Sequence, residues 1–365
     1  MTAGLINAKS SKQPWLSSPL FDLPFILAPA LLTSLLSLYF AGDGSEELSL
    51  ASWVILVLMV DVAHVYATLY RTYFDKEAFA TNKTLLIAIP LLCFVLGVLL
   101  YSLGALFFWR AMAYLAVFHF VRQQYGFMAL YARKELRSRF AVFVDQAAVY
   151  AATLYPIIYW HAHLPRHFNW FVEGDFVSLE IFGTIEPFCR LLYFSILLFY
   201  AFKEVRITLK NGFLNWPRNL LLLGTIFSWW LGIVWSNSDL IFTMTNVVSH
   251  GIPYMALVWL FHHGRRSEGG SSFDFFKNFL LNFAPAFFLF LVLLAYVEEG
   301  FWDGLVWREH LAFFAPFRFD QLPAITDAAA LSVLVPLLSL PQSTHYVLDG
   351  FIWKLKDRDN RFSVY

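Results

Sequence analysis

The sequence predicts an all-α fold, a polytopic bundle of membrane-spanning helices, and three observations lead to this prediction. Hydrophobic residues make up 59% of the 365 residues, and charged residues only 14%. The mean hydropathy is +0.59, and several apolar runs reach the ~20 residues that a helix needs to cross a bilayer. Leu, Phe and Ala fill both faces of these runs, which favours helices over strands. No polar segment approaches the length of a typical domain, so residues 1–365 are expected to form a single membrane domain.

About ten spans are expected from the apolar runs. They cover 24–41, 51–70, 85–108, 111–132, 142–162, 187–203, 217–236, 239–261, 275–297 and 328–353. We therefore expect the protein to be embedded in the lipid bilayer.

The distribution of Lys and Arg predicts that both termini are cytoplasmic. Cytoplasmic loops carry an excess of these residues. Basic side chains gather after every second span, as in 133–139 and 203–218. The intervening connections are poor in them, and the long loop from Glu298 to Asp327 has two arginines against six carboxylates. The expected location is the inner membrane of a bacterium, with the protein crossing it many times.

Charge and cysteine content exclude two classes of function. The net charge is zero, so the chain lacks the basic surface of a nucleic-acid-binding protein. Cys93 and Cys189 are too few for a disulfide framework or a thiolate metal site. Ten histidines remain as the main source of metal ligands.

The second span carries ionisable residues in an otherwise apolar run. Asp61 and His64 lie in the inner half of this span, where ionisable groups are costly and usually functional. Three further spans, the fourth, eighth and tenth, each hold one histidine: His119, His250 and His345. All four spans run from outside to inside, and the histidines lie roughly 8–20 Å from the inner helix ends at ~1.5 Å per residue. Their matching depth predicts that they converge on one intramembrane site.

A metal centre is the simplest chemistry for such a site. Neutral imidazole is the commonest protein ligand for iron, copper and zinc. One turn from two of the histidines stand Asp61 and Asp349, which are candidates for further ligands or for acceptors that orient the imidazoles. A single intramembrane histidine, by contrast, often serves only as a hydrogen-bond partner between helices.

Polar residues at spacings of three and four complete the predicted site. Gln123 and Asn246 follow the faces of His119 and His250 and are expected to support the ligands from behind. Arg122 is expected to pair with Asp61, Asp349 or an anionic headgroup. Candidate catalytic residues are Arg122 itself and two tyrosines that can relay protons or electrons, Tyr254 and Tyr346.

The architecture broadly resembles the polyhistidine non-haem iron enzymes of membranes, which include fatty-acid desaturases and hydroxylases and the Brp/Blh-type β-carotene dioxygenases. The sequence departs from the desaturases in lacking their HxxxH and HxxHH clusters. Its closing segment, His345-Tyr346-Val347-Leu348-Asp349-Gly350-Phe351-Ile352-Trp353-Lys354, looks like one found in uncharacterised bacterial membrane proteins. The resemblance implies non-haem iron and a hydrophobic substrate.

The leading hypothesis is therefore an iron-dependent membrane oxidoreductase that acts on a lipid or isoprenoid and receives electrons from a cytoplasmic donor. Three alternatives remain open at this point. The first is a haem b electron-transfer protein with histidine axial ligands, and the second is a proton-coupled transporter using Asp61, Arg122 and His250 as a relay. The third is a metal-free transferase or lyase in which Arg71 and Arg122 bind an anionic headgroup.

Overall fold

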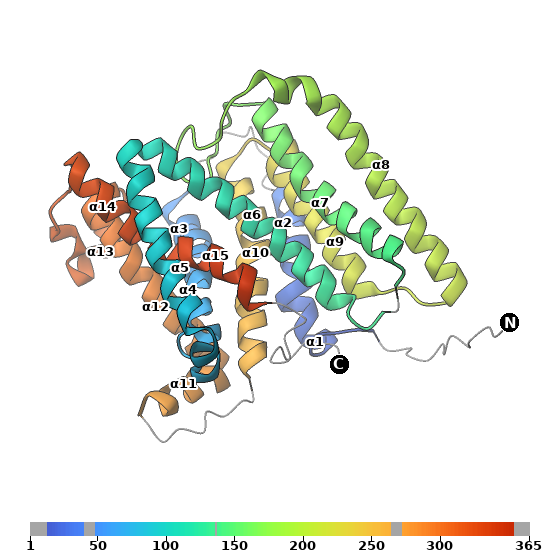
Figure 1. The fold of residues 1–365 in the computed structure, drawn as a ribbon, viewed down its shortest axis with the longest axis horizontal. Coiled ribbons are helices and arrows are strands. Elements are labelled where there is room, and N and C mark those ends of the chain that lie inside the picture. The colour runs from blue at the N-terminus through green and yellow to red at the C-terminus, as the bar shows by residue number, and fades with distance from the viewer. Residues whose placement is uncertain (1–12, 40–47, 136, 264–271, 354–365) are drawn as a thin grey trace.

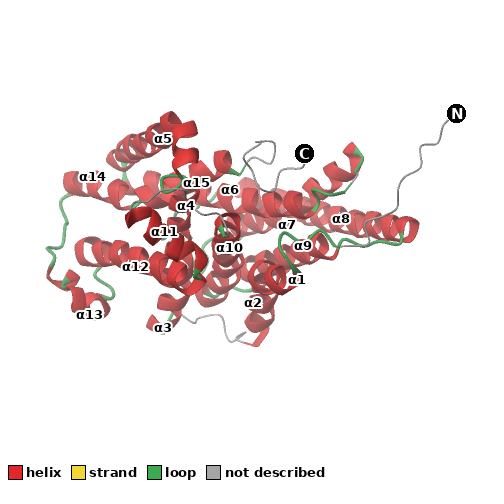
Figure 2. Ribbon diagram, turned by 90° about the horizontal axis from the view of Figure 1, so that it is seen from below, coloured by secondary structure: helices red, strands yellow, loops and turns green. Residues whose placement is uncertain are grey.

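The structure is a computed structural model that describes residues 13–39, 48–135, 137–263 and 272–353. Within these ranges every regular element is a helix, as Figures 1 and 2 show. The predicted all-α class is thereby confirmed for the described part of the chain.

Nine helices in the described ranges are long and apolar enough to cross a membrane. Several contain a π-helical piece. The label η marks the helices that are not α-helices: η1 to η4 are π-helices, and η5 and η6 are 3₁₀ helices. In chain order the nine are α1–η1–α2 (Pro19–Asp22, Leu23–Leu27, Ala28–Tyr39), α3–η2–α4 (Leu50–Trp53, Val54–Val62, Ala63–Arg71), α5 (Lys76–Leu103), α6 (Ala105–Tyr131), α7 (Arg139–Ala162), α8 (Glu180–Asn211), α9–η3 (Trp216–Trp229, Trp230–Trp235), α10 (Asp239–His262) and α12–η4 (Ala284–Trp302, Asp303–Trp307).

The ninth predicted span is wrong in its bounds. The run 275–297 combines α11 (Ser272–Asn282) with the first part of α12, and Phe283 between them has an extended backbone. Pro285 stands in the first turn of α12, where its missing N–H is tolerated. It does not allow α11 and α12 to form one continuous helix. The membrane-length helix is therefore Ala284–Trp307.

The tenth predicted span is also divided. The run 328–353 consists of α14 (Ala328–Leu338) and α15 (Leu340–Ile352), which follow one another along α5. Pro341 in the first turn of α15 cannot donate the hydrogen bond that would continue α14. Gly97 of α5 lies at this break, and a Cβ there would be 2.9 Å from Cβ of Pro336. Between α12 and α14 lie three short helices: α13 (Leu311–Phe314), η5 (Ala315–Phe317) and η6 (Phe319–Gln321).

Helix α10 is the centre of the bundle (Figure 1). It packs against α2, η2, α4 and η3, and nearly all of its residues are buried, including Thr243, Thr245 and Asn246. Polar residues on the central helix must find partners among the surrounding helices, because neither water nor lipid reaches them.

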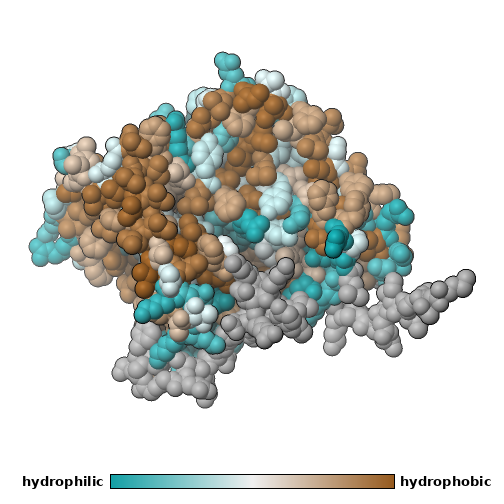
Figure 3. Space-filling view, viewed as in Figure 1, coloured by the Kyte–Doolittle hydropathy of each residue, from teal (hydrophilic) through white to brown (hydrophobic). Residues whose placement is uncertain are grey.

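Helices α5 and α8 have the opposite character. Each presents a row of large apolar side chains to the outside, and Figure 3 shows such side chains gathered over α5. On α5 the row contains Ile87, Leu91, Leu92, Val95, Leu96 and Leu99, and on α8 it contains Phe188, Leu191, Phe194, Leu198, Phe202 and Val205. Such surfaces suit contact with acyl chains rather than with water.

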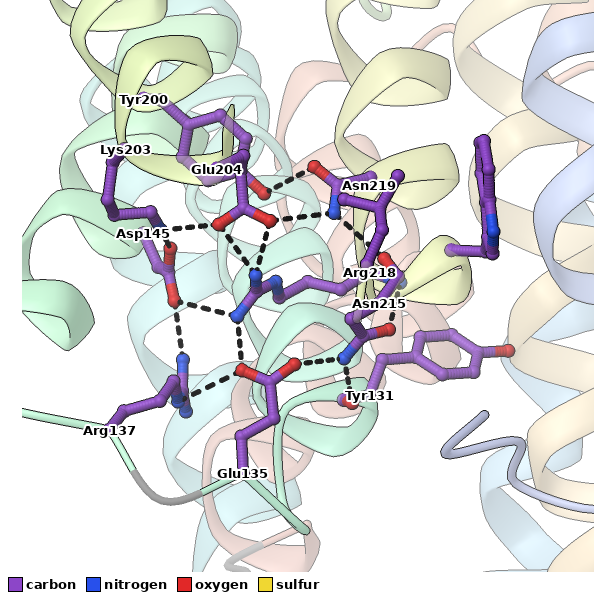
Figure 4. Close-up of polar contacts among 12 residues, drawn as sticks. Tyr131, Glu135, Arg137, Asp145, Tyr200, Lys203, Glu204, Asn215, Arg218 and Asn219 are labelled. Atoms are coloured by element: carbon purple, nitrogen blue, oxygen red, sulfur yellow. Dashed lines mark hydrogen bonds and ion pairs between the residues drawn. The ribbon is translucent and has the colours of Figure 1, made fainter. Parts of the chain in front are cut away.

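One end of α7, α8 and α9 is joined by a network of buried charges (Figure 4). Arg218 binds Glu135 through Nη1, and its Nη2 donates to both carboxylate oxygens of Glu204 at 2.6 Å. Asp145 binds Lys203 and also Arg137, the latter at 2.6 Å. Three acidic and three basic side chains thus cancel one another. We regard this network as structural, because each buried charge has an opposite charge beside it.

Candidate metal centre

Four histidines from four helices meet in the interior of the bundle. They are His64 of α4, His119 of α6, His250 of α10 and His345 of α15, and none exposes more than 3% of its surface. One ring nitrogen from each lies within 4.8 Å of the corresponding atoms of the others. The structure therefore brings together the four residues that the sequence predicted to converge.

The four imidazoles form a closed ring in which each touches two others. The ring centroids are 4.8 Å apart for His64 and His250, 4.8 Å for His250 and His119, 4.5 Å for His119 and His345, and 5.0 Å for His345 and His64. Neighbouring rings are steeply inclined, at 67–87°. This packing points ring edges, where the nitrogens are, toward a common centre.

The Nε2 atoms of His64, His119 and His250 face one another. Nε2 of His250 lies 3.2 Å from Nε2 of His64 and 3.1 Å from Nε2 of His119. Nε2 of His345 is buried and has no hydrogen-bond partner among the described residues. A metal ion that accepted all four lone pairs would satisfy these atoms together. The donor set fits a metal site on this ground.

The Nδ1 atoms of His64 and His345 have protein partners, whereas Nδ1 of His250 is buried without a hydrogen-bond partner among the described residues. Nδ1 of His64 is 3.2 Å from the Val60 carbonyl oxygen, which can only accept, so the proton lies on Nδ1 and the lone pair on Nε2. Nδ1 of His345 is 2.6 Å from Oγ1 of Thr68. Partners of this kind fix the tautomer and rotation of metal-binding imidazoles.

The two predicted carboxylates lie beside the imidazoles rather than among the facing Nε2 atoms. Asp61 Oδ1 is 3.8 Å from Nδ1 of His64. Asp349 stands between two rings, 3.7 Å from Nδ1 of His119 and 3.9 Å from Nδ1 of His345. At these distances neither carboxylate hydrogen-bonds an imidazole, and neither belongs to the group of ring nitrogens that could share a metal ion.

Tyr254 links three of the helices that carry the site. Its hydroxyl donates to Oδ1 of Asp349 at 2.6 Å and lies 2.9 Å from Oγ1 of Thr68. A continuous chain of polar contacts therefore runs from Asp349 through Tyr254 and Thr68 to His345. The other predicted tyrosine, Tyr346, packs its ring 5.1 Å from that of His119.

Three further predicted site residues form no hydrogen bond with an imidazole ring among the described residues. Arg122 has an exposed side chain that donates to the Tyr150 hydroxyl at 3.0 Å, so the expected pairing with Asp61 or Asp349 is not formed. Gln123 donates to the backbone carbonyl of His250 at 2.9 Å, and the Asn246 amide donates to the Phe242 carbonyl at 3.1 Å. Gln123 thus supports the backbone of α10 at its histidine, and Asn246 supports it one turn earlier.

Local backbone structure sets the position of His64. The preceding nine residues form the π-helix η2, a wider turn that is often found at functional sites. Gly251 of α10 lies against this turn, where a Cβ would be 2.8 Å from Cγ1 of Val60 and 3.4 Å from Nδ1 of His64. Only a residue without a side chain allows α10 to approach this closely.

His250 is held by an aromatic contact. The ring of Phe120 stacks on it with a centroid distance of 3.6 Å and an angle of 7°. Trp170, from the connection between α7 and α8, packs in turn on Phe120 at 5.1 Å. That connection is ordered by Asp175, which accepts hydrogen bonds from the backbone of Trp170 and Phe171 at 2.9 and 2.7 Å.

Sequence reasoning missed two acidic residues near the site, Glu298 and Glu299. It assigned them to an external loop, whereas the structure places both in α12. Glu298 is buried and accepts a hydrogen bond of 2.6 Å from the Tyr66 hydroxyl. The signal that could have revealed them is the apolar pair Phe301-Trp302, which resumes the helical pattern after the two glutamates.

Comparison with protein families, curated proteins and solved structures found no match to this chain. The function is therefore argued from the site itself.

Proposed function

We propose that this protein is a membrane-embedded, metal-dependent oxidoreductase with a non-haem iron site, acting on a hydrophobic substrate such as a lipid or isoprenoid. The observation that carries the proposal is the closed ring of four buried histidines, each of which offers a ring nitrogen within 4.8 Å of those of the others. Intramembrane ionisable residues are rare because they are costly, and four at one point need a compensating role.

The ligand set supports iron and redox chemistry. Imidazole ligands suit zinc, copper, iron and nickel, whereas calcium and magnesium prefer oxygen. The Nε2 atoms of His64, His119, His250 and His345 would hold the ion. Bound iron would supply one-electron redox chemistry, with coordination positions left over for oxygen or substrate.

The residues behind the ligands have two roles in this proposal. Thr68 orients the imidazole of His345, and the Asp349 carboxylate lies near both His345 and His119. Tyr254 keeps a proton in a short hydrogen bond to Oδ1 of Asp349, so this pair can deliver or take up a proton next to the site. Tyr346, packed on His119, is the second candidate for this role.

The position of the site supports a hydrophobic substrate. The histidines are enclosed by helices long and apolar enough to cross a membrane, and α5 and α8 expose wide apolar faces. Lipids and isoprenoids are the substrates that reach such a site from the bilayer. We place both termini in the cytoplasm, and the chain in a bacterial inner membrane, because basic residues gather in alternate connections. A cytoplasmic redox protein would then be the electron donor.

The geometry favours this proposal over haem b. A haem iron with two histidine ligands needs its axial nitrogens about 4 Å apart, at ~2 Å from the metal on each side. Neighbouring Nε2 atoms are closer, at 3.1 and 3.2 Å. For histidines on opposite sides of the ring, the other two imidazoles occupy the space that the flat macrocycle needs.

The transporter and transferase alternatives both use Arg122. Its exposed side chain is directed to Tyr150 and lies over the ring of Tyr125. It therefore does not connect Asp61 with His250. Arg71, the other arginine of the transferase hypothesis, donates to the Ile352 carbonyl at 3.2 Å.

The proposed reaction is tested on membranes that contain the full chain. Lipid extracts from cells producing the wild type, His345→Ala or His163→Ala are compared by mass spectrometry with oxygen present. His163 is an exposed histidine outside the site and serves as the control. We expect an oxidised or desaturated lipid with the wild type and the control but not with His345→Ala. Identical lipids in all three would contradict the proposal.

A further inference from the structure

Three acidic side chains lie on two helical elements that pack against each other beside His64. Asp61 belongs to η2, and Glu298 and Glu299 belong to α12, which packs along both η2 and α4. One oxygen of Glu298 accepts from Tyr66, and the other, Oε1, is buried without a hydrogen-bond partner among the described residues. This carboxylate oxygen can bind a ligand that the chain itself does not provide.

Asp303 of η4, directly after α12, adds a fourth carboxylate to this set. Among the described residues, no Lys or Arg forms an ion pair with Asp61, Glu298, Glu299 or Asp303. Two other buried acids, Asp145 and Glu204, are paired with Arg and Lys (Figure 4). Uncompensated buried charges of one sign are unfavourable unless a cation or protons join them.

The acidic residues continue along the end of α12 into η4. Asp303 follows Glu299 by about one turn and accepts hydrogen bonds from the backbone N–H groups of Glu309 and His310, both at 2.7 Å, where the connection to α13 begins. At the other end, Asp61 Oδ1 is 3.8 Å from Nδ1 of His64. The side chain of Asp61 keeps 29% of its surface exposed, although Val60 and Val62 on either side are buried. Acidic residues are therefore found both at the connection to α13 and beside the histidines, where Asp61 is partly exposed.

We propose that Asp61, Glu298 and Glu299 form a transit site for a divalent cation, through which the metal reaches the four histidines from the α12–α13 end of the molecule. The inference rests on the proposed metal centre and adds its route of uptake. Carboxylates bind divalent cations but hold iron, cobalt and zinc less selectively than imidazoles do. A cation attracted to these residues would therefore move on to the ring of histidines.

The uptake rate is measured on the full-length protein in lipid nanodiscs after removal of metal with a chelator. Co²⁺ is the probe, because its absorbance changes when imidazoles bind it, and binding is followed by stopped flow. A channel lined by one sign of charge raises association rates by 10–10³. We expect Glu298→Gln and Glu299→Gln to bind Co²⁺ at least about tenfold more slowly than the wild type. The final occupancy, determined by elemental analysis, should be unchanged.

Two further variants make the result specific. Glu298→Asp keeps the charge and should keep most of the rate, which also covers the case in which the glutamine variant does not fold. Glu180→Gln removes an exposed carboxylate at the start of α8 and should have no effect. Equal rates in all variants, with full occupancy, would overturn the uptake route and leave the metal centre standing. Failure of the wild type to bind Co²⁺ at equilibrium would overturn the metal centre and the route with it.

Discussion

The hydroxyl oxygen of Thr68 lies 2.6 Å from Nδ1 of His345, so a side chain on α4 sets the orientation of an imidazole on α15. The contact matters because α15 is a short helix that begins only at Leu340. His345 is thus oriented by a contact with α4 as well as by its own helix, α15.

Thr68→Val should weaken metal binding while keeping the fold. Valine has nearly the same shape but no hydroxyl, so His345 loses its partner and its preferred rotation. Loss of such a partner costs 10–100-fold in metal affinity, and we expect a decrease of about this size in a competition titration with a chromogenic chelator. Thr68→Ser keeps the hydroxyl and should bind like the wild type. An affinity equal to that of the wild type in Thr68→Val would show that this contact does not position His345.

Gly251→Ala should disturb both stability and the site. The added methyl would lie 2.8 Å from Cγ1 of Val60 and 3.0 Å from its carbonyl oxygen, the acceptor of His64. Overpacking of this kind costs about 1–3 kcal/mol, and we expect a lower Tm and reduced metal content. Gly126→Ala on α6 is the matched control, because a Cβ there meets nothing within 4 Å. A Tm for Gly251→Ala as high as for the control would argue against close packing at η2.

Arg122→Gln should leave metal content unchanged. The sequence suggested that this arginine pairs with a carboxylate of the site, but the structure directs its side chain to Tyr150. Elemental analysis of the purified variant decides between these two views. Loss of metal in Arg122→Gln would restore the sequence-based hypothesis.

Arg218→Met should destabilise the protein without acting on the histidines directly. Removing one partner from a buried ion pair costs about 3–5 kcal/mol, because the remaining charges lose their compensation. Here Glu135 and Glu204 would both lose their contacts with Arg218. We expect a markedly lower Tm in nanodiscs, with normal metal content in the protein that stays folded. An unchanged Tm would mean that the network of Figure 4 contributes little to stability.

The sequence was sufficient to predict the four histidines of the site, because an imidazole in an apolar run stands out and depth can be counted along a helix. It also predicted that Asp349 and Tyr254 accompany them, from spacings of one turn. Side-chain direction was harder to predict. Arg122 follows His119 by three residues, and only the packing of α7 shows that it turns to Tyr150.

Helix ends were the other source of error. Glu298 and Glu299 look like the start of a polar loop, but the helix α12, which packs on η2 and α4, continues to Trp302. The break between α14 and α15 falls in an apolar stretch, where Pro341 was the one available signal. Helices can accommodate proline, as Pro253 in α10 shows, so this signal alone does not predict a break.

The central claim is that the four histidines bind one metal ion, and elemental analysis of the purified full-length protein tests it most directly. The wild type and the control His163→Ala should contain close to one iron ion per chain. His64→Ala, His119→Ala, His250→Ala and His345→Ala should each lose it while remaining folded by circular dichroism. Wild-type protein that is folded, was produced with ample iron and contains no stoichiometric metal would contradict the account.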